Sequence, residues 1–241
     1  MKLAQILDKL NEISPFALSE SWDSSGLQIG DLDSEIDTVF LSLECDSGVI
    51  KECPSGSLII AHHPLIFKPL KNLNFSLYPQ SAIKEIIKKD ISVIAMHTNF
   101  DTTHLNIAFA NSLGLSGGEA CGYVYKVAVD LDFNDLLLSV KEKLELNSLS
   151  YVKPCKDKIK SIAIICGSGG DLIDKIDADV FITGDIKYHQ AISANERGLG
   201  VIDASHYASE NHFAPLMQEL LKNSGIDAKI IKSQNPLKVL I

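Results

Sequence analysis

The feature that most constrains the fold is a repeated succession of short Val- and Ile-rich runs and helical patterns. The runs are continuous instead of alternating with polar residues, which is typical of strands covered on both faces. The predicted strands are Thr38–Leu43, Leu58–Ala61, Ser92–Met96, Ser161–Cys166, Asp179–Thr183, Gly200–Ile202 and Ala228–Ile231. The predicted helices are Met1–Ile13, Ser81–Lys89, His104–Leu113, Asn134–Leu146, Asp171–Ile176, Lys187–Arg197 and Ala208–Lys222. This alternation predicts an α/β fold.

A cluster of glycines at residues 114–122 marks a loose boundary in the 241-residue chain. We therefore expect an N-terminal α/β half over residues 1–120 and a C-terminal α/β half over residues 121–241. Polar residues that could act as ligands fall on both sides of this boundary. For this reason we expect the two halves to interlock around one shared site.

Composition excludes several classes of protein. No apolar run approaches the roughly 18 residues of a membrane span, and charges interrupt the N-terminal segment too early for a signal peptide, so a cytoplasmic protein is predicted. The net charge is −9 and Arg197 is the only arginine, which argues against nucleic acid as a partner. The five cysteines form no C-x-x-C pair, which favours reduced, mostly buried thiols.

Two predicted strands run directly into histidines. Leu58–Ala61 is followed by His62-His63-Pro64, and Ser92–Met96 is followed by His97 and then Asp101. In open α/β sheets ligands gather beyond the carboxyl ends of the strands, and imidazole with carboxylate suits divalent cations. The alternatives stay open: one histidine of the pair is structural and the other lies at the surface, and Asp101 is a helix N-cap or a turn residue.

Two further strand ends repeat this pattern. Gly200–Ile202 leads to His206 and Glu210, whose spacing of four places them on one face of a helix. An ordinary helix start, with Ser205 as its cap, is the competing interpretation. Asp179–Thr183 leads to Asp185, Lys187 and His189, where His189 could serve acid–base chemistry and Lys187 could bind an anion. The competing interpretation is that Asp185 caps a helix and Lys187 is a solvated surface residue.

Two other motifs are less informative. The run from Cys166 to Asp171 is a glycine-rich turn that lacks the ending of a P-loop, so a tight turn is favoured over a phosphate cradle. The segment from Ser21 to Gly30 contains the only tryptophan and predicts a structural turn or a pocket wall.

Taken together, five of the seven histidines fall at predicted strand ends, accompanied by carboxylates. His104 and His212 lie within helical patterns and are expected to be ordinary helix residues. Five ligands exceed what one tetrahedral zinc needs, and two ions bridged by a carboxylate fit better. Zn, Fe, Mn, Ni and Co all remain open as the metal.

Along essentially its whole length the chain resembles a dinuclear-metal family, the GTP cyclohydrolase 1 type 2 homologues. The marks of that resemblance, in order, are Trp22-Asp23 with Gly26-Leu27-Gln28 and Gly30, His62-His63-Pro64, His97-Thr98-Asn99 with Asp101, Thr183-Gly184-Asp185 with Lys187 and His189, and His206-Tyr207-Ala208 with Glu210.

The resemblance implies two interlinked α/β domains, with layered helices and mixed sheets, in a toroidal homohexamer. It implies that two divalent ions are held by His62, His63, Asp101, His206 and Glu210. Glu210 is expected to be shared by both ions, and His97 and His189 lie near the site as catalytic candidates. The chain departs from the family at Ser24, where many members have Asn, and at Ser205, where many have Gly.

Two functions follow as expectations. The first is a metal-dependent hydrolase that acts on a small nucleotide-like substrate, in the manner of a GTP cyclohydrolase or a phosphoesterase. The second is a non-enzymatic metal-binding or regulatory interaction protein.

Overall fold

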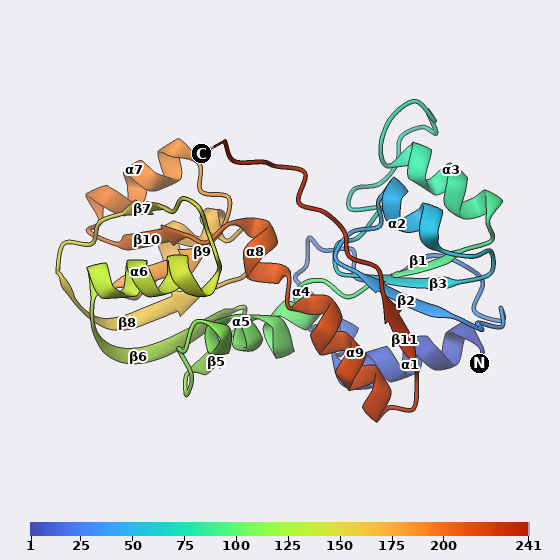
Figure 1. The fold of residues 1–241 in the computed structure, drawn as a ribbon, viewed down its shortest axis with the longest axis horizontal. Helices are drawn as coiled ribbons and strands as arrows, with labels where there is room; N and C mark the ends of the chain where they lie inside the picture. The colour runs from blue at the N-terminus through green and yellow to red at the C-terminus, as the bar shows by residue number, and fades with distance from the viewer. Residues whose placement is uncertain (241) are drawn as a thin grey trace. The chain divides into compact units, whose positions relative to one another are not determined.

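The computed structural model describes residues 1–240, which form two compact units (Figure 1). The first unit is Met1–Phe100 with Phe213–Gln234, and the second is Asp101–His212 with residues 235–240. The contiguous halves 1–120 and 121–241 stay a prediction; in these compact units residues 101–120 belong to the second unit, and residues 213–234 return to the first. There, β11 pairs in parallel with β2.

The first unit is built on a five-stranded mixed sheet with the order β1-β4-β3-β2-β11. Its strands are β1 (Gly26–Ile29), β2 (Val39–Ser42), β3 (Leu58–Ala61), β4 (Ser92–Ala95) and β11 (Ala228–Ile230). All neighbours are parallel except β1, which runs antiparallel to β4. Every residue of β2, β3 and β4 is buried, as the continuous apolar runs predict.

Helices cover both faces of this sheet (Figure 1). Helices α2 (Ser47–Glu52) and α3 (Gln80–Lys88) pack on one face, where their apolar residues join Ile59 and Val93 in one cluster. Helices α1 (Leu3–Ile13) and α9 (Phe213–Asn223) lie on the other face. A short 3-10 turn, η1 (Phe16–Leu18), and one helical turn, α4 (Thr98–Phe100), complete the unit.

The second unit is built on a six-stranded mixed sheet with the order β5-β6-β8-β9-β10-β7. Its strands are β5 (Glu119–Cys121), β6 (Val124–Asp132), β7 (Ser150–Val152), β8 (Lys158–Ile164), β9 (Val180–Thr183) and β10 (Gly200–Asp203). The central strands β8, β9 and β10 are parallel, and the outer pairings are antiparallel.

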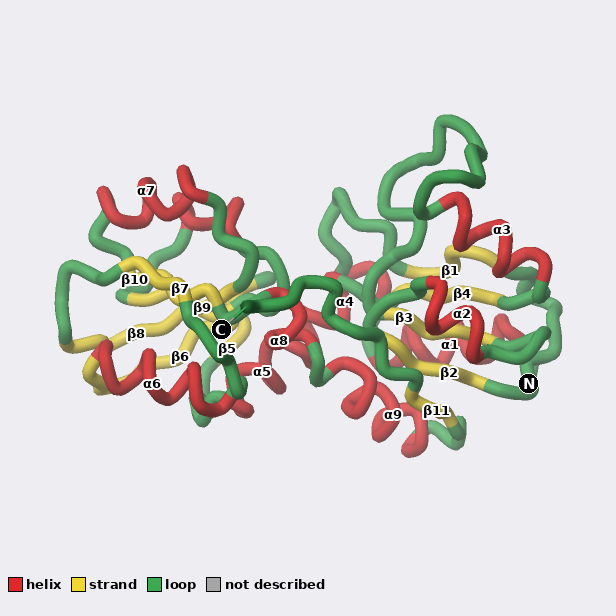
Figure 2. The backbone as a smooth tube through the Cα atoms, turned by 45° about the horizontal axis from the view of Figure 1, so that its top comes forward, coloured by secondary structure: helices red, strands yellow, loops and turns green. Residues whose placement is uncertain are grey.

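Helices also lie on both faces of the second sheet, as Figure 2 shows for α6 and α7. Helix α7 (Tyr188–Glu196) and the 3-10 turn η3 (Gly170–Lys175) share a cluster with Phe181 and Val201. Helices α5 (Asn106–Ser112) and α6 (Phe133–Lys143) contact β6. A π-helical turn, η2 (Asp101–Leu105), precedes α5, and the short helix α8 (His206–Glu210) follows β10.

The predicted α/β class with mixed sheets and layered helices is confirmed, with local differences. The predicted helix Ala208–Lys222 is two helices, α8 and α9, with a break at residues 211–212. Four strands were not predicted, namely β1, β5, β6 and β7. Within residues 1–240, no helix combines the length and apolar character needed to cross a membrane.

Candidate metal-binding sites

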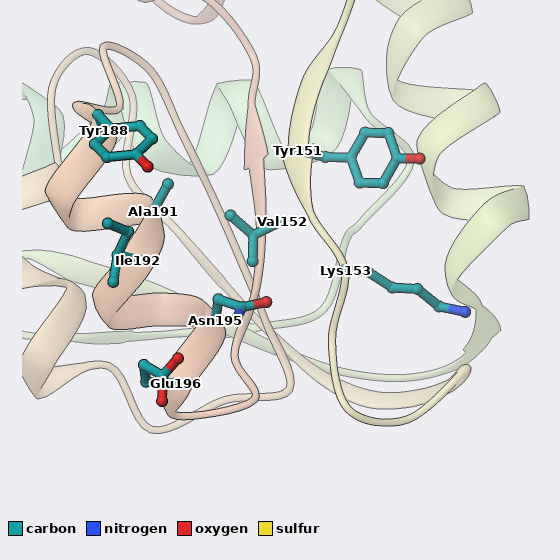
Figure 3. Close-up of a pocket in the computed structure, with 8 residues that line it drawn as sticks. All are labelled: Tyr151, Val152, Lys153, Tyr188, Ala191, Ile192, Asn195 and Glu196. Atoms are coloured by element: carbon teal, nitrogen blue, oxygen red, sulfur yellow. The ribbon is translucent and has the colours of Figure 1, made fainter.

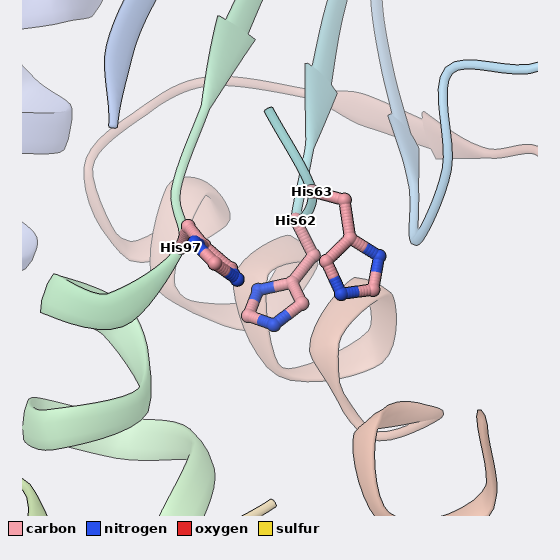
Figure 4. Close-up of side chains that lie close together, drawn as sticks. All are labelled: His62, His63 and His97. Atoms are coloured by element: carbon pink, nitrogen blue, oxygen red, sulfur yellow. The ribbon is translucent and has the colours of Figure 1, made fainter. Parts of the chain in front are cut away.

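In the first unit, parallel strand order brings the predicted histidines together. Strands β3 and β4 are neighbours with Ala61 paired to Ala95, so the residues that follow them emerge side by side. His62 and His63 follow β3, and His97 follows β4 by one residue (Figure 4). One ring nitrogen from each histidine lies within 4.8 Å of those from the other two, which is close enough to hold one metal ion.

The three imidazoles are packed against one another. The ring centroids of His62 and His63 are 4.8 Å apart, and that of His97 is 5.2 Å from His62 and 5.4 Å from His63. His62 is fully buried and also packs on Phe213, at 5.0 Å between centroids. The alternative in which one histidine of the pair lies apart at the surface therefore does not describe the structure.

Each of these rings has its Nδ1 directed at a hydrogen-bond acceptor. His62 Nδ1 donates to the backbone oxygen of Met96 at 2.8 Å. His63 Nδ1 donates to Glu44 Oε1, and His97 Nδ1 donates to Asp23 Oδ1, both at 2.7 Å. Since a carbonyl or carboxylate only accepts, Nδ1 carries the proton and Nε2 is the atom with the lone pair in the neutral ring. This second partner is characteristic of metal-ligating histidines.

Asp23 is a buried carboxylate at the start of the segment that leads into β1. Besides His97, its oxygens accept from the Ser25 hydroxyl at 2.6 Å and from the Thr98 hydroxyl and backbone N–H at 2.6 and 3.1 Å. Burial raises the pKa of Asp23. The hydrogen bond and the charge interaction with His97 outweigh burial and hold the pKa of this carboxyl well below its usual range.

In the second unit, the parallel strands β8, β9 and β10 end at one edge of the sheet. His206 begins α8 shortly after β10, and Glu210 ends it, so the pair lies on one face as the spacing predicts. His206 Nε2 is 3.1 Å from Glu210 Oε2. His206 Nδ1 donates to Asp185 Oδ2 at 2.6 Å, and Asp185 follows β9. His206 thus has the same Nδ1 arrangement as the three histidines of the first unit.

Asp101 opens the π-helical turn and is almost completely buried, at 1% exposure. Its Oδ2 accepts from the Tyr123 hydroxyl at 2.8 Å, and its Oδ1 accepts from the Cys166 thiol at 3.2 Å. Burial and the nearby negative charge of Asp101 raise the pKa of Tyr123 and of Cys166 well above their ordinary values. Both groups therefore stay protonated as donors to this carboxylate.

Gly167 allows the turn after β8 to approach Glu210. Its φ is +65°, and a Cβ at this position would overlap the Glu210 carboxylate and lie 3.4 Å from His206 Nε2. The N–H groups of Gly167 and Gly169 donate to Ser209 Oγ and Thr183 Oγ1, at 2.9 and 2.8 Å. Because both N–H groups have protein acceptors, the tight-turn interpretation is favoured over a phosphate cradle.

The structure places His189 and Lys187 outside these groups. His189 lies on α7 with an exposed ring beside Tyr188, and Lys187 is the exposed residue that precedes this helix. Asp185 does not cap α7, but instead accepts from His206. The catalytic roles of His97 and His189 stay predictions.

Sequence reasoning missed the residues that support the histidines. Asp23 stood in a motif interpreted only as a turn or pocket wall, and Glu44 was not singled out. Tyr123 and Cys166 were not connected with Asp101, although Cys166 is the last residue of a predicted strand. A carboxylate after the neighbouring strand β2 was the available signal for Glu44, since β2 and β3 are parallel.

The second unit also has a surface cavity of about 370 Å³ between β7 and α7 (Figure 3). Tyr151 and Lys153 line one side, and Tyr188, Ile192 and Glu196 line the other. None of the predicted ligands or catalytic candidates lines it.

Comparison with known proteins identifies close relatives. A protein of Campylobacter jejuni named "GTP cyclohydrolase 1 type 2 homolog" is 47% identical over 239 residues, covering 99% of both chains. A Helicobacter pylori protein named "GTP cyclohydrolase 1 type 2" is 42% identical over 239 residues, covering 98% of both.

Solved structures agree in fold. Staphylococcus aureus protein SA1388 superposes with a TM-score of 0.87 at 28% identity, covering 100% of this chain and 99% of that one. Reduced HcgD from Methanocaldococcus jannaschii gives a TM-score of 0.81 at 29% identity, covering 96% and 97%. The profile of the family Duf34/NIF3 (NGG1p interacting factor 3) matches residues 1–236, and the chain belongs to this family.

Proposed function

We propose that this protein binds two divalent transition-metal ions and uses them to hydrolyse a small nucleotide-like substrate. The ligands proposed are those predicted from the sequence: His62, His63, Asp101, His206 and Glu210. The observation that carries the metal proposal is the shared Nδ1 arrangement of His62, His63 and His206, each of which donates to a fixed oxygen acceptor. This arrangement fixes the ring orientation and makes Nε2 the atom that can donate a lone pair to a metal.

The donor set also fits the proposed ions. Neutral imidazole nitrogens with two carboxylates suit Zn, Fe, Mn, Ni or Co, and the two carboxylates balance the charge of the ions. Asp101 is held in place by two protonated donors, the Tyr123 hydroxyl and the Cys166 thiol. When bound, a divalent ion supplies Lewis acidity, which lowers the pKa of water and polarises the group under attack.

The substrate class rests on the relatives. The 42%-identical Helicobacter pylori protein bears the name GTP cyclohydrolase 1 type 2. For such a substrate, attack falls on the purine C8 position. Lys187, which is exposed before α7, is then available to an anionic group, and His189 is available for proton transfer.

The test begins with metal content. Purified protein is expected to contain divalent metal by elemental analysis, and Glu210→Ala is expected to lose metal. Turnover of GTP and of simple phosphoesters is then measured with the metal-loaded protein. Activity that survives unchanged in Glu210→Ala would remove the proposed ions from the reaction.

A second function is suggested by the family name, which describes an interacting factor. In this alternative the protein binds metal but turns over no substrate. His189→Ala separates the two proposals, since the ring is exposed and hydrogen-bonds to none of the proposed ligands in the described structure. Loss of turnover with full metal content favours the hydrolase, whereas no turnover in the wild-type protein against any nucleotide favours the interaction role.

The prediction that both ligand sets serve one shared dinuclear centre, and the predictions of a homohexamer and a cytoplasmic location, stay predictions. Anomalous scattering tests the first, with two ions expected about 3.5–4 Å apart. Light scattering coupled to gel filtration tests the second, because a hexamer of 26.3 kDa chains is distinct from a monomer or dimer.

A further inference from the structure

We infer that Trp22 and Phe67 form the surface that binds the planar base of the substrate, next to the histidines of the first unit. This inference rests on the proposed function and deepens it, because it assigns the base of a purine nucleoside or nucleotide to named side chains. Both residues belong to the first unit. Neither is a proposed metal ligand, so their part in binding can be separated from metal content.

The two aromatic rings lie against each other and against His97. The ring centroids of Trp22 and Phe67 are 6.0 Å apart. They are 6.2 and 6.1 Å, respectively, from the centroid of His97, and both of these contacts are edge-on, with interplanar angles of 79° and 83°. A base that stacks on either aromatic ring therefore lies close to the histidines that follow β3 and β4.

Both rings are exposed, unlike the aromatic side chains of the core. Trp22 is 54% exposed and Phe67 is 41% exposed, whereas Phe100 and Phe213 in the same unit are fully buried. Large apolar side chains at the surface are informative when they occur together. An exposed aromatic face stacks with nucleobases, because every base has a π-face of its own.

The relative orientation of the two rings suits a planar ligand. Their planes are inclined by 60°. A base that lies parallel to one ring meets the other at a steep tilt, close to an edge-to-face contact. Offset-stacked and edge-to-face arrangements are the two that aromatic pairs prefer. The pair therefore offers one planar ring two favourable contacts at once.

Hydrogen bonds hold the backbone on both sides of Trp22. The Glu20 N–H donates to Thr98 Oγ1 at 2.9 Å, and the Asp23 N–H donates to the backbone oxygen of Glu20 at 2.9 Å. The tryptophan side chain itself has only two rotatable torsions, so ordering it on binding costs little conformational entropy. Trp22 is thus exposed and yet fixed in position before a ligand binds, which favours affinity.

Gln28 and Ser24 connect the segment of Trp22 with the segment of Phe67. Gln28 Nε2 donates to the backbone oxygen of Ser24 at 2.5 Å, and Gln28 Oε1 accepts from the Ile66 N–H at 3.1 Å. Ser24 Oγ donates to the backbone oxygen of Phe67 at 3.2 Å. These bonds fix the two rings relative to each other, although they are distant in the sequence.

The test uses the emission of Trp22, the only tryptophan in the chain. Guanosine and GTP are titrated into the metal-loaded full chain, with correction for light absorbed by the base. Both are expected to quench the emission with saturation. Ribose 5-phosphate and tripolyphosphate have no base and are expected to leave it unchanged. Guanosine is also titrated in the presence of a chelator, where quenching is expected to persist because the surface consists of side chains alone.

Two substitutions measure what each ring contributes. Phe67→Ala is expected to weaken guanosine binding about 5- to 150-fold, the range for losing one contact between a base and an aromatic ring. Trp22→Ala is expected to weaken it by a similar factor, measured by equilibrium dialysis because this variant has no tryptophan emission. Trp22→Phe is expected to recover most of the affinity, since it restores an aromatic face.

Phe75→Ala is the matched control. Phe75 is a phenylalanine of the same connection between β3 and α3, and at 45% its exposure is close to that of Phe67. Its ring lies under Lys84, with Nζ 5.3 Å from the centroid. This variant is expected to bind guanosine as the wild type does. Metal content and the midpoint of thermal unfolding are measured for every variant, and Phe67→Leu provides the same comparison should Phe67→Ala fail to fold.

Several results would overturn the inference. If guanosine does not bind, or if Phe67→Ala and Trp22→Ala keep the wild-type affinity, the base does not lie on these rings. If acrylamide does not quench Trp22 in the wild-type protein, the surface is covered, and a second copy of the chain becomes its occupant.

Turnover separates this inference from the proposed function. GTP turnover with an unchanged KM in both alanine variants overturns the inference while the hydrolase stands. Guanosine binding that depends on both rings, in a protein that turns over no nucleotide, supports the inference while the hydrolase fails.

Discussion

Gly167→Ala tests whether a glycine is required at this turn of the second unit, because the added methyl group would overlap the proposed ligand Glu210. The backbone at Gly167 has φ +65°, a left-handed conformation that costs an L-residue about 1–2 kcal/mol. The Cβ would also overlap the carboxylate of Glu210, whose side chain is 3% exposed and has little space to move. Displacing it adds about 1–2 kcal/mol through an unfavourable rotamer and the lost contact with His206.

The expected decrease in the free energy of unfolding is therefore about 2–4 kcal/mol for Gly167→Ala in metal-free protein. Gly117→Ala is the matched control in the same unit, with φ +80° and open space where the added methyl group would stand. It is expected to cost only the backbone component of about 1–2 kcal/mol. Thermal unfolding in a chelator distinguishes the two, since each kcal/mol shifts the midpoint of a chain this long by about 2–4 °C.

Metal titration of the same two variants completes this test. Because Glu210 is displaced, Gly167→Ala is expected to lose at least about tenfold in affinity for metal, and Gly117→Ala is expected to bind as the wild type does. Equal destabilisation by the two substitutions, with equal metal affinity, would refute the argument that Gly167 is required for the approach to Glu210.

Three further predictions follow from other contacts. Tyr123→Phe removes a hydrogen bond to the buried Asp101 and is expected to cost about 1.5–3 kcal/mol of stability and to weaken metal binding, both measured as above. Tyr125→Phe, which loses only a bond from a backbone N–H, is its control and should leave metal affinity unchanged. Ser205→Gly is expected to raise the midpoint of thermal unfolding, because Ser205 has φ 64° and ψ 133°, a conformation that costs a non-glycine residue about 1–3 kcal/mol. Burial raises the pKa of the Cys45 thiol to about 12. Above pH 9 the unfolded chain therefore loses this proton before the folded chain does, and the free energy of unfolding falls as the pH rises. In Cys45→Ala, the free energy of unfolding measured in urea is expected to depend less on pH between pH 9 and 12.

The fold was predictable wherever burial on both faces leaves a continuous apolar run. Strand β3 was predicted with its observed bounds, because Leu58–Ala61 is covered by helices on both sides. Strand β6 was missed because it is half-exposed and alternates in burial at its start, with Tyr125 and Val127 inside and Lys126 between them. The discontinuous first unit was not predictable from local pattern, since the pairing of β11 with β2 joins residues far apart in the sequence.

For the site, the candidate ligands were predictable, but the groups that hydrogen-bond to them were not. Ligand candidates follow from a local rule, that polar residues directly after parallel strands meet at one edge of a sheet. His62, His63 and His97 obey it, because β3 and β4 are neighbours in register. The hydrogen-bond acceptors of these rings cannot be predicted from such a local rule. His62 donates to the backbone of residue 96, which has no side-chain signature, and Asp23 lies before an antiparallel strand, whose start is at the same edge as the end of β4.

This difference explains why the tryptophan-containing segment was interpreted as a turn and not as part of the proposed metal site. Strand β1 runs opposite to its neighbour, so the residues that reach the site from it precede the strand instead of following it. Asp23, Ser24 and Ser25 stand there, and each takes part in the hydrogen bonds around the carboxylate that orients His97. The same reasoning applies to any antiparallel edge strand beside a parallel sheet: residues before it should be searched together with residues after its parallel neighbours. In this chain that search connects Asp23 with His97 across 74 residues, which neither segment suggests alone.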